Sequence, residues 1–570
     1  MLVERMTDAL HHRGPDARGF CWGRKAHLGA TRLSIIDPDS GAQPTYNETG
    51  RLCIIFNGEI YNHHQLRADL RRSGHCFASE TDTEVVIHLY EEYGEQCVHR
   101  LRGMFAFAIL DEDRLFLARD RLGIKPLYYA LLPEAQLFLF ASEIKAILQC
   151  PQYTPRLDMR AFADSVVLGY PAGTETYLEG IRTLAPGHTM TVECGDAVKV
   201  GEQLRYFHRD WVRDEAIGFE EAQHTLENAL REAITTHLAA DVEVGLTLSG
   251  GLDSTVLALL AAEQSAGPAM TFTVADDEQH PDLMQGRLVA EMTGGRHFSI
   301  VPTFDDYLRV IPGYIAAEEV PSTLSGLPFY FLCQKIATYL KVCLHGEGAD
   351  ELFGGYREYL DRQYRLSYML RRLPLLKQLG ALPSDRVLEI AEGLSASRFD
   401  DYLEQVFRIN LSDTLERQHL NPVDKCGMAA GVEIRVPYLD DAVVELVGGF
   451  PLRHLVRTDL GIRKYILRRL CLKRFGSKTV DVLLREKLGV PSACVQYMDR
   501  FDRLCNETLP DDYLSRHELG NCFESKRQLL LFDFFTEIFV THRGNSENAG
   551  GVLDFLRMTA NGRPLAALAE

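Results

Sequence analysis

The sequence predicts a two-domain protein in which an α+β sandwich is followed by an α/β domain with a helical C-terminal part. Over residues 1–205, short apolar runs are separated by Gly, Asn and Asp, a pattern typical of strands and turns. Over residues 215–545, strand-like runs alternate with helical patterns, and beyond Leu370 the pattern is mostly helical. The last stretch, residues 546–570, is rich in small and polar residues and is predicted to be a loosely held tail.

The spacing of apolar residues predicts the individual elements. In the first domain, alternating runs predict strands over residues 27–33, 52–56, 106–110, 115–118 and 137–141. A helix is predicted over residues 84–93, and the domain boundary is placed in the polar stretch 193–210, which has no regular period. In the second domain, an apolar residue recurs at every fourth position from Leu226 to Leu238, which predicts a helix over residues 222–238.

Composition excludes several classes of protein. The net charge is −19 without a long basic run, which argues against a nucleic-acid surface. No apolar stretch reaches the length of a membrane span, and the first five residues do not resemble a signal peptide. The 13 cysteines form no Cys-x-x-Cys pair, and the 19 histidines show no spacing typical of metal ligands. We therefore expect a cytoplasmic protein with reduced thiols and neither a zinc site nor a disulfide framework.

The first stretch that indicates chemistry is Ser-Gly-Gly-Leu-Asp-Ser-Thr at residues 249–255, which follows a strand-like run over residues 242–248. Its glycines permit close approach of a ligand, and the free N–H groups of the helix that follows favour an anion. Ser249, Ser254 and Thr255 add hydroxyl groups, and Asp253 could hold a divalent ion against phosphate oxygens. The motif of a Walker A loop is absent, so transfer of a γ-phosphate is not implied. Taken alone, the stretch also fits a tight turn between a strand and a helix.

A second stretch of this kind lies about a hundred residues later. Residues 344–356 contain four glycines and four acidic or imidazole side chains, and they follow a strand-like run over residues 342–344. Ligands of open α/β sheets bind at the carboxyl ends of the strands. If the two strands are neighbours, Asp253 and Asp350 lie close enough to share Mg²⁺.

Several further motifs recur in the order found in one known family. They are His-Arg-Gly-Pro-Asp at 12–16, Arg-Leu-Ser-Ile-Ile-Asp at 32–37, Phe-Asn-Gly-Glu-Ile-Tyr-Asn at 56–62, Thr-Asp-Thr-Glu at 81–84, and residues 103–108, 118–129, 431–440 and 485–491. With the two loops, these motifs resemble glutamine-dependent asparagine synthetases over nearly the whole chain. The resemblance implies an N-terminal-nucleophile (Ntn) type glutaminase sandwich of the class II amidotransferases. It also implies a synthetase domain similar to the adenine-nucleotide α-hydrolases.

The resemblance implies an ATP-dependent ligase that forms an amide through an acyl-adenylate and releases AMP and pyrophosphate. The implied ATP-binding residues are Leu248, Ser249, Gly250, Gly251, Leu252, Asp253, Ser254, Thr255, Val274, Gly346, Glu347 and Gly348. Asp253 and Asp350 would hold Mg²⁺. Lys487 would stabilise negative charge as the acyl-adenylate forms, and Glu347 would handle the proton of the attacking nitrogen. Without the resemblance, the sequence predicts that Lys487 is an ordinary surface lysine and that Glu347 is a carboxylate at the start of a helix.

The resemblance also implies a glutamine pocket in the first domain. Arg32 would pair with the carboxylate of glutamine, while Asn57, Gly58, Glu59 and Asp82 would hold its other polar atoms. The chain departs from the family because the expected N-terminal cysteine is missing: residue 2 is leucine, and the first cysteine is Cys21. Either the start is assigned too far downstream, or the enzyme uses ammonia and its glutaminase domain is vestigial. In both cases the sandwich as printed lacks an inner strand.

The acceptor is less closely defined than the reaction. Aspartate is the default, but residues 318–322 read Glu-Glu-Val-Pro-Ser where many family members have Asp-Glu-Pro, and a specialised biosynthetic carboxylate is an alternative. Ring closure as in β-lactam synthetases is another alternative, although a tyrosine stands there in place of Glu347. A non-catalytic scaffold and a nucleotide-activating thiolase are disfavoured by the retained charged residues and by the amidotransferase motifs. The expected partners are ATP, a carboxylate and ammonia or glutamine, with a possible homodimer and with neither nucleic acid nor membrane.

Overall fold

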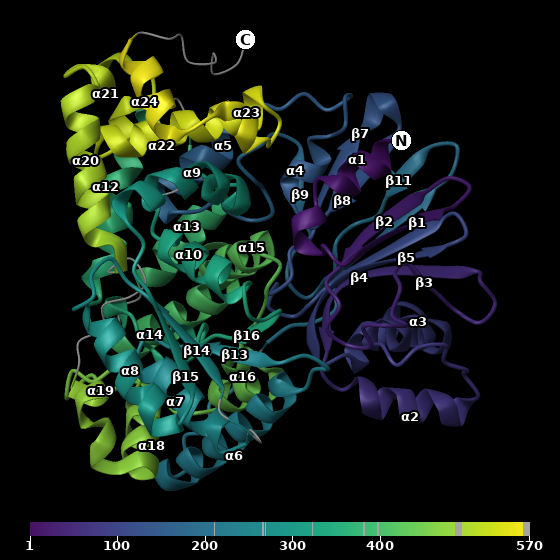
Figure 1. The fold of residues 1–570 in the computed structure, drawn as a ribbon, viewed down its shortest axis with the longest axis horizontal. Helices are drawn as coiled ribbons and strands as arrows, with labels where there is room; N and C mark the ends of the chain where they lie inside the picture. Colours follow the sequence, from purple (N-terminus) through teal and green to yellow (C-terminus); the bar gives the residue numbers. More distant parts are fainter. Residues whose placement is uncertain are drawn as a thin grey trace.

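The computed structural model describes residues 1–570 except 210, 265–266, 268, 322, 380–381, 396–397, 485–492 and 562–570. A strand-rich N-terminal half lies beside a larger, mainly helical C-terminal half (Figure 1). Among the described helices, none combines the length and the apolar composition that crossing a membrane requires.

A large antiparallel sheet forms the centre of the N-terminal half. Its order is β11 (Val198–Val200), β10 (His188–Cys194), β6 (Arg114–Arg119), β5 (Gly103–Asp111), β4 (Leu52–Ile60) and β3 (Thr45–Tyr46), and β12 (Leu204–Arg205) also pairs with β10. Side chains of β5 alternate between the two faces, as the period of a strand requires. Phe105 and Phe107 pack in the core with helices α2 (His63–Ser73) and α3 (Asp82–Tyr93), while Ala106 and Ala108 belong to the core on the other face.

The second layer of the sandwich is divided into two small sheets. One is the hairpin β1 (Ala17–Trp22) and β2 (His27–Arg32), and the other has the order β8 (Leu137–Ala141), β7 (Tyr128–Leu132), β9 (Ile181–Thr183). Helices α1 (Leu2–Asp8) and α4 (Ile144–Ile147) pack on this layer, and α5 (Met159–Leu168) follows. Residues of β2 and of β8, each paired on one side only, line a common cavity of about 570 Å³. This division is consistent with the expected lack of an inner strand.

A five-stranded parallel sheet forms the centre of the C-terminal half. Its order is β15 (Arg296–Ile300), β14 (Met270–Val274), β13 (Val244–Thr247), β16 (Val342–Leu344) and β17 (Glu433–Arg435). Every ladder is parallel, and the three central strands are almost fully buried, as expected for a sheet with helices on both faces. The helices nearest to it are α6 (Phe219–Leu238), α7 (Leu252–Ala262), α8 (Pro281–Thr293), α9 (Phe304–Glu318), α10 (Leu327–Ile336) and α15 (Asn421–Ala429).

The C-terminal half contains further helices. They are α11 (Ala349–Phe353), α12 (Gln363–Gln378), α13 (Asp385–Leu394), α14 (Phe399–Ile409), the π-helix Asn410–Leu420, α16 (Asp441–Gly448), α17 (Leu452–Leu455), α18 (Tyr465–Phe475), α19 (Val480–Leu484), α20 (Val495–Thr508), α21 (Tyr513–Arg516), α22 (Lys526–Thr536), α23 (Ser546–Ala549) and α24 (Val552–Ala560). The expectation of a loose tail is wrong over residues 546–561. Val552, Phe555 and Leu556 of α24 are buried in the core, because they recur with helical spacing on one face.

Buried ion pairs join the two halves. Asp424 of α15 accepts a hydrogen bond from Arg13 at 2.9 Å and from Lys125 at 3.0 Å, and all three side chains are less than 5 % exposed. Arg119 on β6 pairs with Glu416 of the π-helix at 2.9 Å. Buried charges of this kind fix relative orientation more than they add stability, since desolvation opposes their attraction.

We predict that Asp424→Ala destabilises the protein strongly, because it leaves the buried Arg13 and Lys125 without their shared carboxylate. Loss of one partner of a buried pair costs about 3–5 kcal/mol. Urea unfolding of the full chain measures the effect. The matched control is Asp8→Ala, which breaks a pair with Arg18 on an exposed surface and should change stability by less than about 1 kcal/mol. Equal effects of the two substitutions would contradict the role of Asp424.

The pH dependence of stability gives a second readout of the same site. Burial alone would raise the pKa of Asp424, but Arg13 and Lys125 hold it below its ordinary value. This carboxylate therefore stabilises the fold above its unfolded pKa, and the contribution is lost as the pH falls through the native pKa. Asp424→Ala should flatten the acid side of the profile of Tm against pH, whereas an unchanged slope would show that this carboxylate is not stabilising.

Candidate functional site

A cavity of about 470 Å³ lies at the carboxyl ends of β13, β14 and β16. This is the edge at which open α/β sheets bind ligands. Ten of the residues singled out from sequence line it, namely Leu248, Ser249, Gly251, Leu252, Asp253, Ser254, Val274, Gly346, Glu347 and Asp350. β13 and β16 pair in parallel, so the expectation that the two glycine-containing loops follow neighbouring strands is confirmed.

The first loop places hydroxyl groups and the start of a helix at this cavity. β13 ends at Thr247 and α7 begins at Leu252. Gly250 has φ 66°, and a Cβ there would lie 2.6 Å from the backbone of Gln285, so the turn requires glycine. The hydroxyl of Ser249 lies 3.2 Å from that of Ser254 and accepts a hydrogen bond from the N–H of Gly251. Together with the free N–H groups of α7, these hydroxyls form a cradle for an anion.

The second loop is tied to the sheet on both sides. The N–H of His345 donates to the carbonyl of Arg435 at 2.8 Å, and its ring nitrogen Nδ1 lies 2.6 Å from the hydroxyl of Thr247. Gly348, with φ 88°, caps α11 and packs on Leu439. Gly250, Thr255 and Gly348 do not line the cavity. Thr255 is fully buried beneath the first loop.

A buried lysine connects the two aspartates. The Nζ of Lys464 lies 2.5 Å from Asp253 and 2.7 Å from Asp350, so the expected proximity of the two carboxylates is confirmed. Burial lowers the pKa of Lys464, but the two carboxylates more than compensate and raise it. Two carboxylates that converge on one positive charge are a donor set that also fits Mg²⁺.

Glu347 lies in a chain of alternating acids and imidazoles. Its carboxylate is 3.4 Å from His345 and 3.4 Å from His419, which is also 3.4 Å from Glu351. Burial raises the pKa of Glu347, but the hydrogen bond with His345 and the charge of His419 outweigh it and bring the pKa to about 2. Burial raises the pKa of Glu351 to about 7, although His419 opposes this. Two neighbouring carboxyl groups with such different pKa values are suited to proton transfer.

Sequence reasoning missed several cationic and aromatic groups at this cavity. Arg463, Lys464, Arg468, Tyr356 and His419 all line it. Lys464 and Arg468 are four residues apart at the start of α18, a spacing that puts both on one helix face and that could have indicated an anion site.

The predicted catalytic residue Lys487 lies outside the described residues, as does Ser322. Of the stretch 318–322, Glu318 lines the cavity. Glu319 instead pairs with Lys425 at 2.9 Å, on the side of the first domain.

The other cavity, between β2 and β8, contains all five residues of the predicted glutamine pocket, Arg32, Asn57, Gly58, Glu59 and Asp82. The buried Nδ2 of Asn57 has no hydrogen-bond partner among the described residues, so it is a donor available to a ligand. Gly58 has φ 146°, and a Cβ there would lie 2.0 Å from the carbonyl oxygen of Met104. The guanidinium of Arg32 donates to the carbonyls of Ile36 and Asp37 at 2.9 and 2.7 Å.

Buried acids line this cavity together with basic side chains. Burial raises the pKa of Asp82 to about 6, and burial and the nearby Asp82 raise that of Glu59 well above its ordinary value. Among the described cysteines, Cys194 lines this cavity. Burial raises the pKa of its thiol, so the fold does not activate it as a nucleophile.

Comparison with known proteins agrees with a two-domain architecture. A family model described as a glutamine amidotransferase domain matches residues 1–206, and one described as asparagine synthase matches residues 225–553. The glutamine-hydrolyzing asparagine synthetase 3 of Bacillus subtilis is 32% identical over 534 residues, which cover 86% of this chain and 84% of the relative. The glutamine-hydrolyzing asparagine synthetase 2 of Arabidopsis thaliana is 31% identical over 82% of this chain and 71% of its own length.

A putative glutamine-hydrolyzing asparagine synthetase of Mycobacterium tuberculosis is 29% identical over 95% of this chain and 94% of its own length. The asparagine synthase model alone covers more than half of the chain. The chain therefore belongs to the asparagine synthetase family and carries an N-terminal glutamine amidotransferase domain.

Proposed function

We propose that this protein converts aspartate, ATP and ammonia into asparagine, AMP and pyrophosphate through an aspartyl-adenylate. The observation that carries the proposal is a single cavity that combines an anion cradle, two converging aspartates and three basic side chains. In the first step, the β-carboxylate of aspartate attacks the α-phosphorus of ATP, and pyrophosphate leaves. In the second step, ammonia attacks the acyl carbon, and AMP leaves.

The phosphates of ATP fit the side of the cavity formed by the first loop. Ser249 and Ser254 offer hydroxyl donors, and the N-terminus of α7 favours negative charge. Arg463 and Lys464 add positive charge at the same cavity, and the carbonyl of Gly355 anchors Arg463 at 3.0 Å.

Asp253 and Asp350 would hold Mg²⁺, because their carboxylates already converge on the ammonium group of Lys464. When bound, the ion supplies neutralisation of phosphate charge. Lys464 stays within reach of the same region, where it can stabilise charge that develops on the phosphate in the transition state. Lys487, which the family resemblance assigns to charge stabilisation, stays a prediction.

The chain of acids and imidazoles suits the second step. Glu347 is ionised at neutral pH, since its pKa is about 2, and it can accept a hydrogen bond from the incoming ammonia. Glu351, with a pKa of about 7, can exchange a proton at neutral pH, and it contacts the same imidazole of His419.

Free ammonia is the nitrogen donor we propose for the chain as printed. The cavity between β2 and β8 retains the polar groups of a glutamine pocket, but its described cysteine, Cys194, is not activated. A strand that carries the family's cysteine could fit between the unpaired edges of β2 and β8, and a form with such a strand would use glutamine. Intramolecular ring closure is not favoured, because the relatives are asparagine synthetases. Homodimerisation and a cytoplasmic location stay predictions.

The donor assignment predicts a clear difference between two assays. With ATP, Mg²⁺ and aspartate, the 570-residue chain should release pyrophosphate and form asparagine when ammonium is added, and should form none when glutamine replaces it. Coupled pyrophosphate detection and amino-acid chromatography measure both products. Formation of asparagine from glutamine would refute the assignment of ammonia as the nitrogen donor. Release of pyrophosphate in the absence of aspartate and of both nitrogen donors would refute aspartate as the acceptor.

Lys464 is predicted to act both on catalysis and on metal binding. Lys464→Ala should lower kcat/KM for ATP by about 10²–10³, the usual loss when one preorganised charge donor is removed. It also leaves Asp253 and Asp350 without the ammonium group between them, so Mg²⁺ should raise the Tm of this variant more than that of the unaltered protein.

The matched control is Lys473→Ala, on the same helix α18, because Lys473 is exposed and, among the residues that the structure describes, forms an ion pair only with the exposed Glu220. Its kcat/KM and its response to Mg²⁺ should equal those of the unaltered protein. A variant at Lys464 that loses activity but shows no increased response to Mg²⁺ would contradict the shared position of the lysine and the ion.

A further inference from the structure

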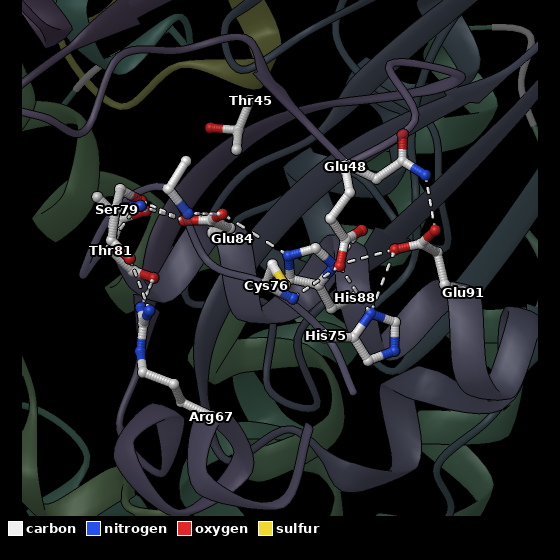
Figure 2. Close-up of polar contacts among 12 residues, drawn as sticks. Thr45, Glu48, Arg67, His75, Cys76, Ser79, Thr81, Glu84, His88 and Glu91 are labelled. Atoms are coloured by element: carbon white, nitrogen blue, oxygen red, sulfur yellow. Dashed lines mark hydrogen bonds and ion pairs between the residues drawn. The ribbon is translucent and has the colours of Figure 1, made fainter. Parts of the chain in front are cut away.

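A group of acids and imidazoles on the first domain lies apart from both cavities (Figure 2). Glu48 belongs to the turn between β3 and β4, and His75 follows the C-terminal cap of α2. His88 and Glu91 lie one turn apart on α3. We call these four residues the His75–His88 cluster. One ligand atom from each can be chosen so that all four lie within 4.8 Å of one another.

The distances within the cluster match the edges of a metal tetrahedron. Nδ1 of His75 lies 3.2 Å from Glu48 and 3.7 Å from Glu91. Nδ1 of His88 lies 3.3 Å from Glu48 and 2.9 Å from Glu91. Ligands at the usual zinc distances of about 2.0–2.2 Å are about 3.3 Å apart in a tetrahedron. His75 faces one oxygen of Glu48 and His88 faces the other, whereas both imidazoles face the same oxygen of Glu91. The two Nδ1 atoms and the two carboxylates therefore lie around a common space.

The outer nitrogen of each imidazole faces another carboxylate. Nε2 of His75 lies 3.1 Å from Glu92, and Nε2 of His88 lies 3.6 Å from Glu84. The side-chain amide of Asn47 holds Glu91 through a hydrogen bond of 2.6 Å. Metal-binding histidines commonly donate their second N–H to a carboxylate, which directs the other nitrogen toward the ion. Both Nδ1 atoms of the cluster face Glu48 and Glu91 (Figure 2).

The charge of the cluster favours a cation. Four carboxylates surround two imidazoles, so an excess of two negative charges remains even when both rings are protonated. His88 is fully buried, whereas the side chains of Glu48 and Glu91 are 31% and 22% exposed, which leaves an entry path from solvent. Metal binding requires neutral imidazoles, and the excess is then four negative charges, of which a dipositive ion would neutralise two.

We propose that Glu48, His75, His88 and Glu91 bind one structural zinc ion that connects the β3–β4 turn to α2 and α3. Two imidazole nitrogens and two carboxylate oxygens form a closed, four-coordinate donor set that suits Zn²⁺, whereas Mg²⁺ prefers six oxygen ligands. Closure by four protein side chains leaves no position for a substrate, so the ion has a structural role. This site is independent of the proposed synthetase reaction, because none of its residues lines either cavity.

The test is zinc binding by the full chain in excess Mg²⁺, which occupies sites made of oxygen ligands alone. Glu48→Gln with His75→Gln removes two ligands that are partly exposed and leaves the buried His88 in place. The matched control is His64→Gln with His99→Gln, two exposed histidines of the same domain outside the cluster. Zinc content after gel filtration and the shift of Tm with added Zn²⁺ are measured for each protein.

The unaltered protein and the control should bind one equivalent of zinc more than the double variant, and zinc should raise only their Tm. Glu92→Gln, which removes the outer partner of His75, should weaken zinc binding by about 10–100-fold. Any zinc bound at Glu347, Glu351 and His419 is common to all variants and cancels in the difference. Equal zinc content and equal Tm shifts in the unaltered protein and in the Glu48/His75 variant would overturn the proposal and leave the cluster as an ion-pair network.

Discussion

The relation between the two cavities depends on one buried side chain, Arg435 at the end of β17. Its guanidinium donates to Glu59 at 2.9 Å and to Glu433 at 2.8 Å, and both of these carboxylates line the cavity of the first domain. Its main-chain carbonyl accepts the N–H of His345 at 2.8 Å, in the loop that shapes the cavity of the second domain. The residue is completely buried, so water cannot replace these contacts. The fold thereby fixes the predicted glutamine pocket and the second loop to the same short strand. The pocket is held through a charged hydrogen bond and the loop through a main-chain hydrogen bond.

Both cavities contain acids that the protein alone neutralises incompletely. In the first, Arg435 reaches Glu59, yet burial still raises the pKa values of Glu59 and Asp82. In the second cavity, Lys464 forms ion pairs with both Asp253 and Asp350, and the pKa of Glu351 is raised to about 7. A buried acid of this kind becomes more stable when a positive ligand arrives. The ligands proposed for the two cavities meet this condition. Glutamine would bring an α-ammonium group to the first cavity, and Mg²⁺ would bring a divalent charge to the second.

Sequence reasoning was most successful where local rules determine geometry. Gly250 and Gly348 require positive φ, and the position of both loops follows from two parallel neighbours, β13 and β16. Lys464 was missed because it is more than a hundred residues from both aspartates along the chain, and only the packing of α18 brings it to them. The buried helix α24 was missed for the opposite reason: its apolar spacing is present in the sequence, but flanking Gly and Asn residues gave the segment the composition of a loop.

The metal site proposed at the His75–His88 cluster is of a kind that spacing rules for metal ligands do not detect. Such rules detect ligands that one short segment supplies, but here only His88 and Glu91 are close in sequence, and Glu48 and His75 join them from other elements. The cluster forms because α2 and α3 pack on β4 beside the turn that carries Glu48. This packed layer is the continuous part of the sandwich, whereas the opposite layer is divided into two sheets around a cavity. The proposed link between the turn and the two helices would stabilise this continuous layer.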